Sequence, residues 1–301
     1  MTKMLKEISE QPRVLRDIAI VNKDTLDKLV SELKNRKVEH AVFAARGTSD
    51  HASIYGQYML GIYAGIISAL AIPSAITVYD AEFKYTNDLI IGVSQSGKAA
   101  DALAVIENAN KNGAITLAVT NDENSPMAKA AKYHLYCNAG LEESVAATKT
   151  FTSEMFLLGA LAALWGERYD VYNELLKAYI LVDKTLKITS EKIDAIVDGY
   201  KDMTNGFVLG RGLSYPTALE AALKIQETCY IKMKGYPTSD FYHGPIAQVE
   251  AGTPVIILAA RGKTFDNACE MDEKIAGIKA NLLVVTDDEE LSKKYKSILL
   301  P

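Results

Sequence analysis

The sequence has 301 residues, of which 49% are hydrophobic, enough for one large or two ordinary domains with filled cores. Its 33 basic and 38 acidic residues give a net charge of −5 without a basic stripe, so we expect no nucleic-acid partner. The three cysteines are odd in number and unpaired in spacing, which argues against a disulfide framework or a zinc cluster.

The sequence shows no sign of a membrane segment. Residues 1–7 lack the apolar core of a signal peptide. The longest apolar stretch, residues 61–76, is interrupted by Pro73 and is shorter than the ~18 to 20 apolar residues that a membrane-spanning helix needs. We therefore expect a cytoplasmic protein with no membrane partner.

Apolar runs alternate along the chain with amphipathic helical stretches. The pattern predicts strands at 40–45, 89–93 and 115–119, and helices at 50–63 and 99–111. The runs at 42–45 and 89–93 are continuously apolar, as is typical of parallel strands covered on both faces. This alternation indicates an α/β fold with doubly wound parallel sheets.

The pattern recurs later in the chain. Gly47-Thr48-Ser49 resembles Gly212-Leu213-Ser214, and Gly97-Lys98 resembles Gly262-Lys263; 212 − 47 and 262 − 97 both give 165. Two matches at one offset predict two similar α/β domains in tandem, residues 1–165 and 166–301, joined through a helical stretch at about 151–200.

The loop Ser94-Gln95-Ser96-Gly97 follows a predicted strand and precedes a predicted helix. Such a junction directs backbone N–H groups and the positive end of a helix dipole at one point, and the two hydroxyls make that point suitable for a phosphate ester. The second copy has Ala259 and Ala260 in its loop, so we expect the phosphate site in the first domain. The alternative is that these residues only cap a helix or form a turn.

Thr48 and Ser49 occupy the equivalent place after the first predicted strand. In a parallel sheet both loops lie at the carboxyl ends of the strands, where ligands bind. For Ser49 alone, a helix-capping role explains the residue equally well.

The predicted helix from Tyr215 to about Tyr230 carries a charged stripe. Glu220, Lys224 and Glu227 are spaced by four and three residues, which places them on one face. Either they form a solvated stripe with a weak ion pair, or they take part in acid–base chemistry.

The loop at residues 234–245 contains His243 directly before Gly244-Pro245, which places this histidine on a turn. Histidine side chains ordinarily titrate near neutrality, which suits proton transfer, although a structural histidine in a turn is an equal alternative. A second segment, residues 139–149, has small residues that allow close approach of the backbone to a ligand, although a simple helix N-terminus would look similar.

Together these features resemble the tandem sugar isomerase (SIS) domains of glucosamine-6-phosphate synthase, without its glutaminase domain. The matching pieces cover nearly the whole chain in order; they are Glu10-Gln11-Pro12, Gly47-Thr48-Ser49, Ser94-Gln95-Ser96-Gly97, Val145 to Phe151, Gly210-Arg211-Gly212, the helix at 218–227 and His243-Gly244-Pro245. Ala99 and Ala147 stand where the family has hydroxyl residues, and Lys98 offers a charge in their place. The chain also stops at Pro301, where the family continues through another helix and a tail with a lysine that closes the site.

The resemblance implies a site with its residues in defined roles. The residues implied to line the phosphate and substrate site are Gly47, Thr48, Ser49, Ser94, Gln95, Ser96 and Val145. Glu227 would move a proton between C1 and C2 of the sugar, Lys224 would lie near the reacting carbons, and His243 would assist ring opening. In the family this histidine comes from a neighbouring subunit, so a homodimer is implied, and no metal or cofactor is required.

About 40 residues precede the first predicted strand, too few for a glutaminase domain. We therefore expect a stand-alone aminosugar-phosphate deaminase/isomerase that converts glucosamine 6-phosphate to fructose 6-phosphate and ammonia, or acts on a close relative such as galactosamine 6-phosphate or a sugar–amine adduct. The alternatives are a non-catalytic sugar-phosphate sensor, or an isomerase of non-amino phosphosugars.

Overall fold

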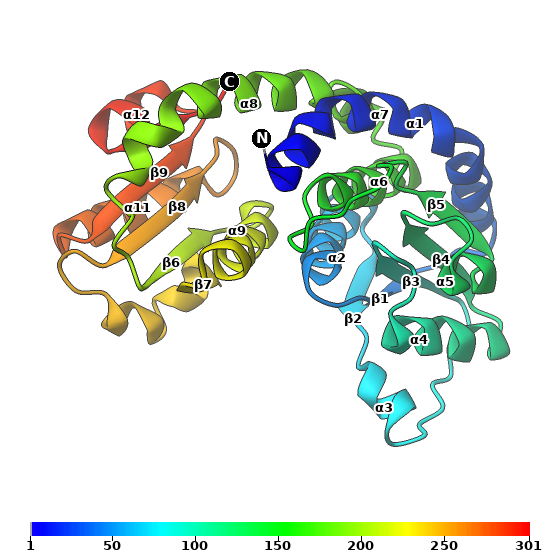
Figure 1. The fold of residues 1–301 in the computed structure, drawn as a ribbon. Coiled ribbons are helices and arrows are strands. Elements are labelled where there is room, and N and C mark those ends of the chain that lie inside the picture. Colours follow the sequence, from blue (N-terminus) through cyan, green and yellow to red (C-terminus); the bar gives the residue numbers. More distant parts are fainter. Residues whose placement is uncertain (1) are drawn as a thin grey trace. The chain divides into compact units, whose positions relative to one another are not determined.

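The computed structural model describes residues 2–301 and divides into two compact α/β units (Figure 1). The first ends at Ile180, and the second runs from Leu181 to Pro301. The sequence predicts a boundary at residue 165, the end of α6 (Lys149–Trp165), but α7 (Tyr169–Leu175) packs on α6 and belongs to the first unit. Helix α8 (Ala178–Val197) continues from one unit into the other.

The first unit is a five-stranded parallel sheet covered by helices. Its strands have the order β2-β1-β3-β4-β5. The strands are β1 (His40–Ala44), β2 (Ile67–Leu70), β3 (Asp88–Ser94), β4 (Ile115–Thr120) and β5 (Tyr133–Tyr136). The remaining helices are α1 (Lys3–Asn35), α2 (Thr48–Met59), a π-helical turn η1 (Leu60–Ala64), α3 (Pro73–Thr77), α4 (Ala100–Lys111) and α5 (Pro126–Ala130).

The second unit contains the same sheet. Its strand order, β10-β9-β8-β6-β7, is that of the first unit read from the other edge, and all its strands are parallel. Its strands are β6 (Asn205–Gly210), β7 (Lys232–Pro237), β8 (Pro254–Ala259), β9 (Asn281–Thr286) and β10 (Ser297–Leu299). Its helices are α9 (Ser214–Cys229), α10 (Thr238–Phe241), the 3₁₀ turn η2 (Pro245–Gln248), α11 (Phe265–Gly277) and α12 (Glu289–Lys294).

The repeat expected from two glycine loops extends over the whole of each sheet. Strands β1 and β6 begin at His40 and Asn205, and helices α4 and α11 begin at Ala100 and Phe265 (205 − 40 and 265 − 100 both give 165). The predicted fold class, two tandem doubly wound α/β domains, is therefore confirmed.

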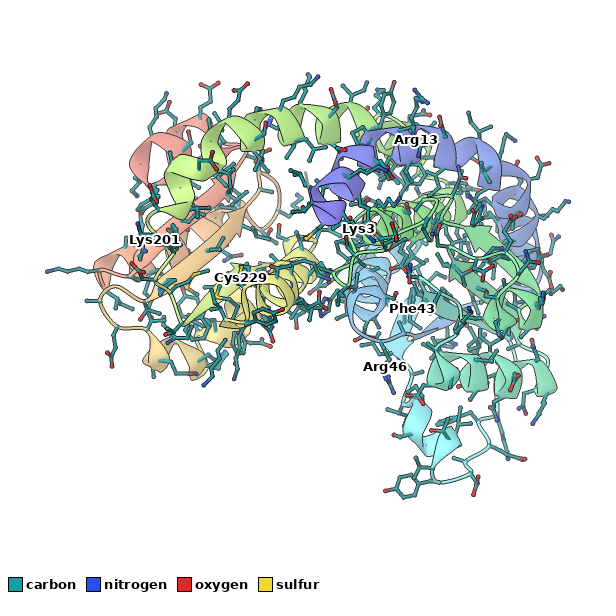
Figure 2. The ribbon with its side chains drawn as sticks, in the orientation of Figure 1. Lys3, Arg13, Phe43, Arg46, Lys201 and Cys229 are labelled. Atoms are coloured by element: carbon teal, nitrogen blue, oxygen red, sulfur yellow. The ribbon has the colours of Figure 1, made fainter. Side chains whose placement is uncertain are left out.

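Each unit has its own apolar core. In the first, β3 and β4 are almost wholly buried, as their unbroken apolar sequences predict. Phe43 of β1 is buried in this core (Figure 2). A Cβ at Gly56 of α2 would come within 2.9 Å of its ring. In the second, Leu209, Ile257 and Met271 belong to a separate buried cluster. None of the helices formed by residues 2–301 is long and apolar enough to cross a membrane.

Candidate functional site

The carboxyl ends of β1 and β3 form the topological switch point of the first sheet. From β1 the chain passes through α2 to β2 on one side, and from β3 it passes through α4 to β4 on the other. These adjacent strands pair in parallel, with Ala44 opposite Gly92, so their following loops begin side by side. A crevice at such a point is where open α/β sheets bind ligands. The structure thus brings together the loops containing Gly47, Thr48 and Ser49 and containing Ser94, Gln95 and Ser96.

The two serines of the second loop have their hydroxyl oxygens occupied by backbone donors. Ser94 Oγ accepts a hydrogen bond from the N–H of Gly97 at 3.2 Å, and Ser96 Oγ accepts one from the N–H of Lys98 at 3.3 Å. Because a hydroxyl has one proton to donate, both serines keep that proton for another acceptor. The loop therefore offers two O–H donors, the chemistry that a phosphate requires.

Gly97 fixes the shape of this loop. Its φ is +62°, and a Cβ at this position would lie 2.1 Å from Ser125 Oγ. Its carbonyl also accepts a hydrogen bond from the N–H of Met127 in α5, at 3.2 Å. Only glycine satisfies both the dihedral angle and the contact.

Ser49 is bonded differently from Ser94 and Ser96. It lies in the first turn of α2, which follows Gly47 at φ +58°. Its hydroxyl donates to Glu154 Oε1 at 2.9 Å, and both residues are buried, Ser49 being 7% and Glu154 0% exposed. This partner was not predictable from the sequence, because Glu154 lies 105 residues away in the apolar helix α6.

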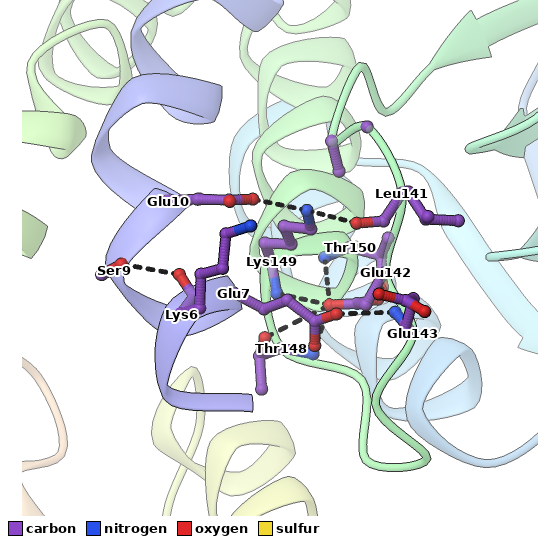
Figure 3. Close-up of polar contacts among 12 residues, drawn as sticks. Lys6, Glu7, Ser9, Glu10, Leu141, Glu142, Glu143, Thr148, Lys149 and Thr150 are labelled. Atoms are coloured by element: carbon purple, nitrogen blue, oxygen red, sulfur yellow. Dashed lines mark hydrogen bonds and ion pairs between the residues drawn. The ribbon is translucent and has the colours of Figure 1, made fainter. Parts of the chain in front are cut away.

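Val145 projects from the loop between β5 and α6 and is 95% exposed. Helix α1 holds this loop: Glu7 Oε1 accepts hydrogen bonds from the N–H groups of Glu143 (2.6 Å) and Ser144 (3.3 Å) (Figure 3). The buried Lys149 binds Glu10 at 2.6 Å and the carbonyl of Leu141 at 2.7 Å. The loop is thereby fixed on both sides of Val145.

Glu142 caps helix α6 from within the same loop. One of its carboxylate oxygens accepts hydrogen bonds from the N–H groups of Thr148 (2.8 Å) and Lys149 (2.9 Å), and the Thr150 hydroxyl donates to the other (Figure 3). A carboxylate at a helix N-terminus satisfies otherwise unpaired donors and complements the helix dipole. This is a structural role that the sequence analysis did not assign.

Asn121 connects the serine loop to the Val145 loop. Its N–H donates to the carbonyl of Gln95 at 2.9 Å. Its side chain accepts from the N–H of Ala139 at 2.9 Å and donates to the carbonyl of Gly140 at 2.7 Å. The feature of the sequence that could have indicated this role is the position of Asn121 directly after a strand.

The charged stripe predicted in the second unit lies on α9 and is largely withdrawn from solvent. Lys224 Nζ lies 2.5 Å from Glu227 Oε2 and 3.2 Å from Glu220 Oε1. The Lys224 side chain is 17% exposed and that of Glu227 28%. The stripe is therefore partly buried, and it contains the Glu220–Lys224 ion pair as well as the contact between Lys224 and Glu227.

His243 lies on a turn between α10 and η2, as its place before Gly-Pro predicts. Its N–H donates to the carbonyl of Asp240 at 3.0 Å, and the residue is exposed. Its ring is thus available at the surface of the second unit.

The second unit has an equivalent switch point between β6 and β8 with different chemistry. By the 165-residue offset, Arg261 occupies the place of Ser96 (261 − 96 = 165). Its N–H donates to Asp287 Oδ1 at 2.7 Å, and its Nε lies 3.4 Å from Oδ2. Within residues 2–301 no group of three or more His, Cys, Asp or Glu side chains is arranged to hold a metal ion.

Two doubly wound units, one with a hydroxyl-rich loop at its switch point, define a tandem α/β protein with a candidate phosphate site in its first half. The chain belongs to the SIS domain family, which matches residues 32–164 and 201–293, one segment in each unit.

Relatives of known sequence and structure agree with this assignment. Glutamine–fructose-6-phosphate aminotransferase [isomerizing] of Aquifex aeolicus is 34% identical over 98% of the chain, which spans 50% of that enzyme. A Silicibacter pomeroyi protein proposed to be a phosphosugar isomerase is 30% identical over the whole chain and 90% of its own, with a TM-score of 0.90. The C-terminal domain of the Francisella tularensis aminotransferase is 26% identical, with a TM-score of 0.85 over 99% of the chain and 87% of its own.

Proposed function

We propose that the chain is a phosphosugar isomerase that acts on an aminosugar phosphate, converting glucosamine 6-phosphate to fructose 6-phosphate and ammonia. The observation that carries the phosphosugar part is the pair of free O–H donors of Ser94 and Ser96 at the switch point of the first sheet. Membership of the SIS family and similarity to the isomerizing aminotransferases support a sugar phosphate as the ligand.

The acid–base part of the proposal rests on Lys224 and Glu227. In the open-chain sugar, Glu227 takes the proton from C2 and returns it to C1. The C2 amine becomes an imine as it loses one proton, and O1 gains a proton to become a hydroxyl. Water then adds to the imine carbon, and ammonia leaves to give the ketone. Lys224, 2.5 Å from Glu227, supplies positive charge for the oxygen that becomes negative in the enol-type intermediate.

The test is an assay of ammonia release coupled to fructose 6-phosphate detection, with glucosamine 6-phosphate and galactosamine 6-phosphate as parallel substrates. Turnover of one of them supports the proposal and identifies the sugar. Interconversion of fructose 6-phosphate and glucose 6-phosphate without ammonia release would restrict the activity to non-amino sugars. Binding of hexose phosphates with no turnover of any of them would support a sensor instead.

We also propose that the active form is a homodimer in which His243 serves the site of the partner. The exposed turn that carries His243 supports this arrangement. A mixture of Glu227→Gln and His243→Ala subunits tests it after dissociation and reassociation. If the histidine acts across the interface, one site of each mixed dimer is intact, and roughly a quarter of the sites regain activity on random mixing. If it acts within its own subunit, the mixture stays inactive.

A further inference from the structure

Lys98 follows the serine loop directly and carries a positive charge that no other residue opposes. Its N–H donates to Ser96 Oγ at 3.3 Å, so the residue lies beside one of the two hydroxyls of the proposed phosphate site. Lys98 is exposed, and its ammonium has no ion-pair or hydrogen-bond partner in the part of the chain that the structure describes. Because a lysine side chain is long and flexible, this ammonium can reach a group bound at Ser96.

The position of this charge is unfavourable unless an anion is present. Helix α4 begins two residues after Lys98, and its N-cap residue, Ala99, offers no side chain that caps the helix. The N-terminus of a helix carries partial positive charge, which disfavours a neighbouring cation and favours an anion. The free ammonium, the helix without a side-chain cap and the two hydroxyl donors therefore favour an anion together.

The acidic residue in the first turn of α4 does not neutralise Lys98, because it is already paired. This residue is Asp101, whose Oδ2 lies 2.7 Å from Nη2 of Arg46 in the loop after β1. Two opposite charges in contact largely cancel each other at the distance of a bound ligand. The pair of Arg46 and Asp101 thus leaves the charge of Lys98 uncompensated.

We propose that Lys98 is a specificity residue of the phosphate site: it pairs with the ester and selects a phosphate over a sulfate. This inference rests on the proposed phosphosugar function and leaves the contacts of the serine hydroxyls unchanged. Hydroxyl and N–H donors bind both esters through similar oxygens, because the two groups have the same tetrahedral shape. The ammonium of Lys98 distinguishes them, since its attraction grows with the negative charge of the ligand.

The test compares glucosamine 6-phosphate with glucosamine 6-sulfate by isothermal titration at pH 8, where the phosphate carries about two negative charges and the sulfate carries one. Lys98→Met removes the positive charge and keeps most of the side chain, and thermal melting checks that the variant is folded. We expect Lys98→Met to weaken binding of the phosphate ester about tenfold and of the sulfate ester about threefold, because the lost attraction is roughly proportional to the ligand charge. The preference for phosphate over sulfate should therefore fall about threefold.

Two control variants separate the charge of Lys98 from its position in the chain. Lys98→Arg keeps the charge, and we expect it to retain the preference for the phosphate ester. Lys263→Met makes the same change at the equivalent position of the second unit (263 − 98 = 165), after a loop in which the N–H of Arg261 is bonded to Asp287. We expect this variant to keep both affinities within about twofold of the unmodified protein.

Failure of this inference and failure of the proposed function give different results. If Lys98→Met does not weaken the phosphate ester more than the sulfate ester, or if Lys263→Met has the same effect, Lys98 does not select phosphate and the inference is wrong. If the unmodified protein binds neither ester, or if Ser94→Ala leaves both affinities unchanged, the phosphosugar site is misplaced. The proposed function then fails, and the role of Lys98 fails with it.

Discussion

The two units have the same sheet and different chemistry. At the switch point of the first, Ser94 and Ser96 present O–H donors; at that of the second, Arg261 is bonded to Asp287. In the helices that follow the first strand of each unit, the charged residues are instead in the second unit. Lys224 and Glu227 of α9 correspond by the 165-residue offset to Met59 and Ile62 (224 − 59 and 227 − 62). The shared topology gives each unit a switch point, and the side chains at the two switch points differ.

The largest effect should come from Glu227→Gln, which removes the proposed base without changing the shape of the side chain. We expect a loss of turnover of about 10²- to 10⁴-fold, with phosphosugar binding changed less than threefold, because the phosphate contacts that we propose are those of Ser94 and Ser96. Steady-state kinetics and titration on the same preparation check both numbers. Equal losses of turnover and binding would contradict the role of Glu227 as the base.

The next largest effect is on the free energy of unfolding. It comes from a buried carboxylate in the second unit, whose equivalent in the first unit is exposed. Asp272 of α11 is fully buried, and neither of its carboxylate oxygens has a hydrogen-bond partner in the part of the chain that the structure describes. Burial raises the pKa of Asp272 to about 7, with Lys294 opposing the shift. Because the folded state then holds the proton more tightly than the unfolded chain, stability falls as the pH rises from about 4 through 7.

Asp272→Asn should abolish this pH dependence. A shift of this size corresponds to a free energy on the order of 4 kcal/mol, which the unmodified protein loses above pH 7. Urea unfolding at pH 5 and pH 8 checks the difference. Its matched control is Glu107→Gln at the equivalent position of the first unit (272 − 107 = 165), where the side chain is exposed. The same pH response in both variants would show that Asp272 is not the group responsible.

Substitutions at one equivalent position in the two switch-point loops should have a smaller effect, which is on phosphosugar affinity. Ser96→Ala removes one O–H donor, and we expect phosphosugar affinity to fall about tenfold. Arg261→Ser places a hydroxyl at the corresponding position of the second unit, and we expect phosphosugar affinity to change less than twofold. Calorimetric titration of both variants with fructose 6-phosphate measures the contrast. A weaker complex of Arg261→Ser would assign a ligand role to the second loop.

The smallest effect should come from the contacts between α1 and the Val145 loop. Burial alone would raise the pKa of Glu7, but hydrogen bonds from Ser144 and Glu143 and the charge of Lys149 lower it below its usual value. Glu7→Gln keeps an acceptor but loses the charge, so we expect KM to rise two- to threefold with kcat nearly constant.

The control for Glu7 lies in the same contact region. Lys3 pairs with Glu143 at 2.9 Å, and both side chains are exposed, so Lys3→Ala should leave KM unchanged. A larger rise of KM in the Lys3→Ala variant than in the Glu7→Gln variant would contradict the role assigned to Glu7.

Much of the fold was predictable because its signals are local. The apolar run ending at Ser94, the glycine at 97 and the helical pattern after it together specify a strand, a turn and a helix. The single offset of 165 residues extends that prediction to the second unit. The turn that holds His243 follows from Gly244-Pro245 in the same way.

The residues that the sequence did not reveal depend on contacts between distant segments. Glu154 and Asp272 are ordinary helical carboxylates by sequence, and only tertiary packing shows that both are buried. Asn121 and Lys149 likewise look like surface residues until the Val145 loop folds over them. The direction of the Ser49 hydrogen bond belongs to the same class, because it depends on a partner in another helix.

The Arg261–Asp287 contact has a consequence for stoichiometry. Two equivalent copies of one binding fold in a single chain would take up two equivalents of ligand. In the second copy an internal carboxylate already occupies the loop N–H group and faces the guanidinium, so the place of an anion is filled. We therefore expect the chain to titrate as a single-site binder that saturates at one equivalent of phosphosugar, and uptake of a second equivalent would contradict this expectation.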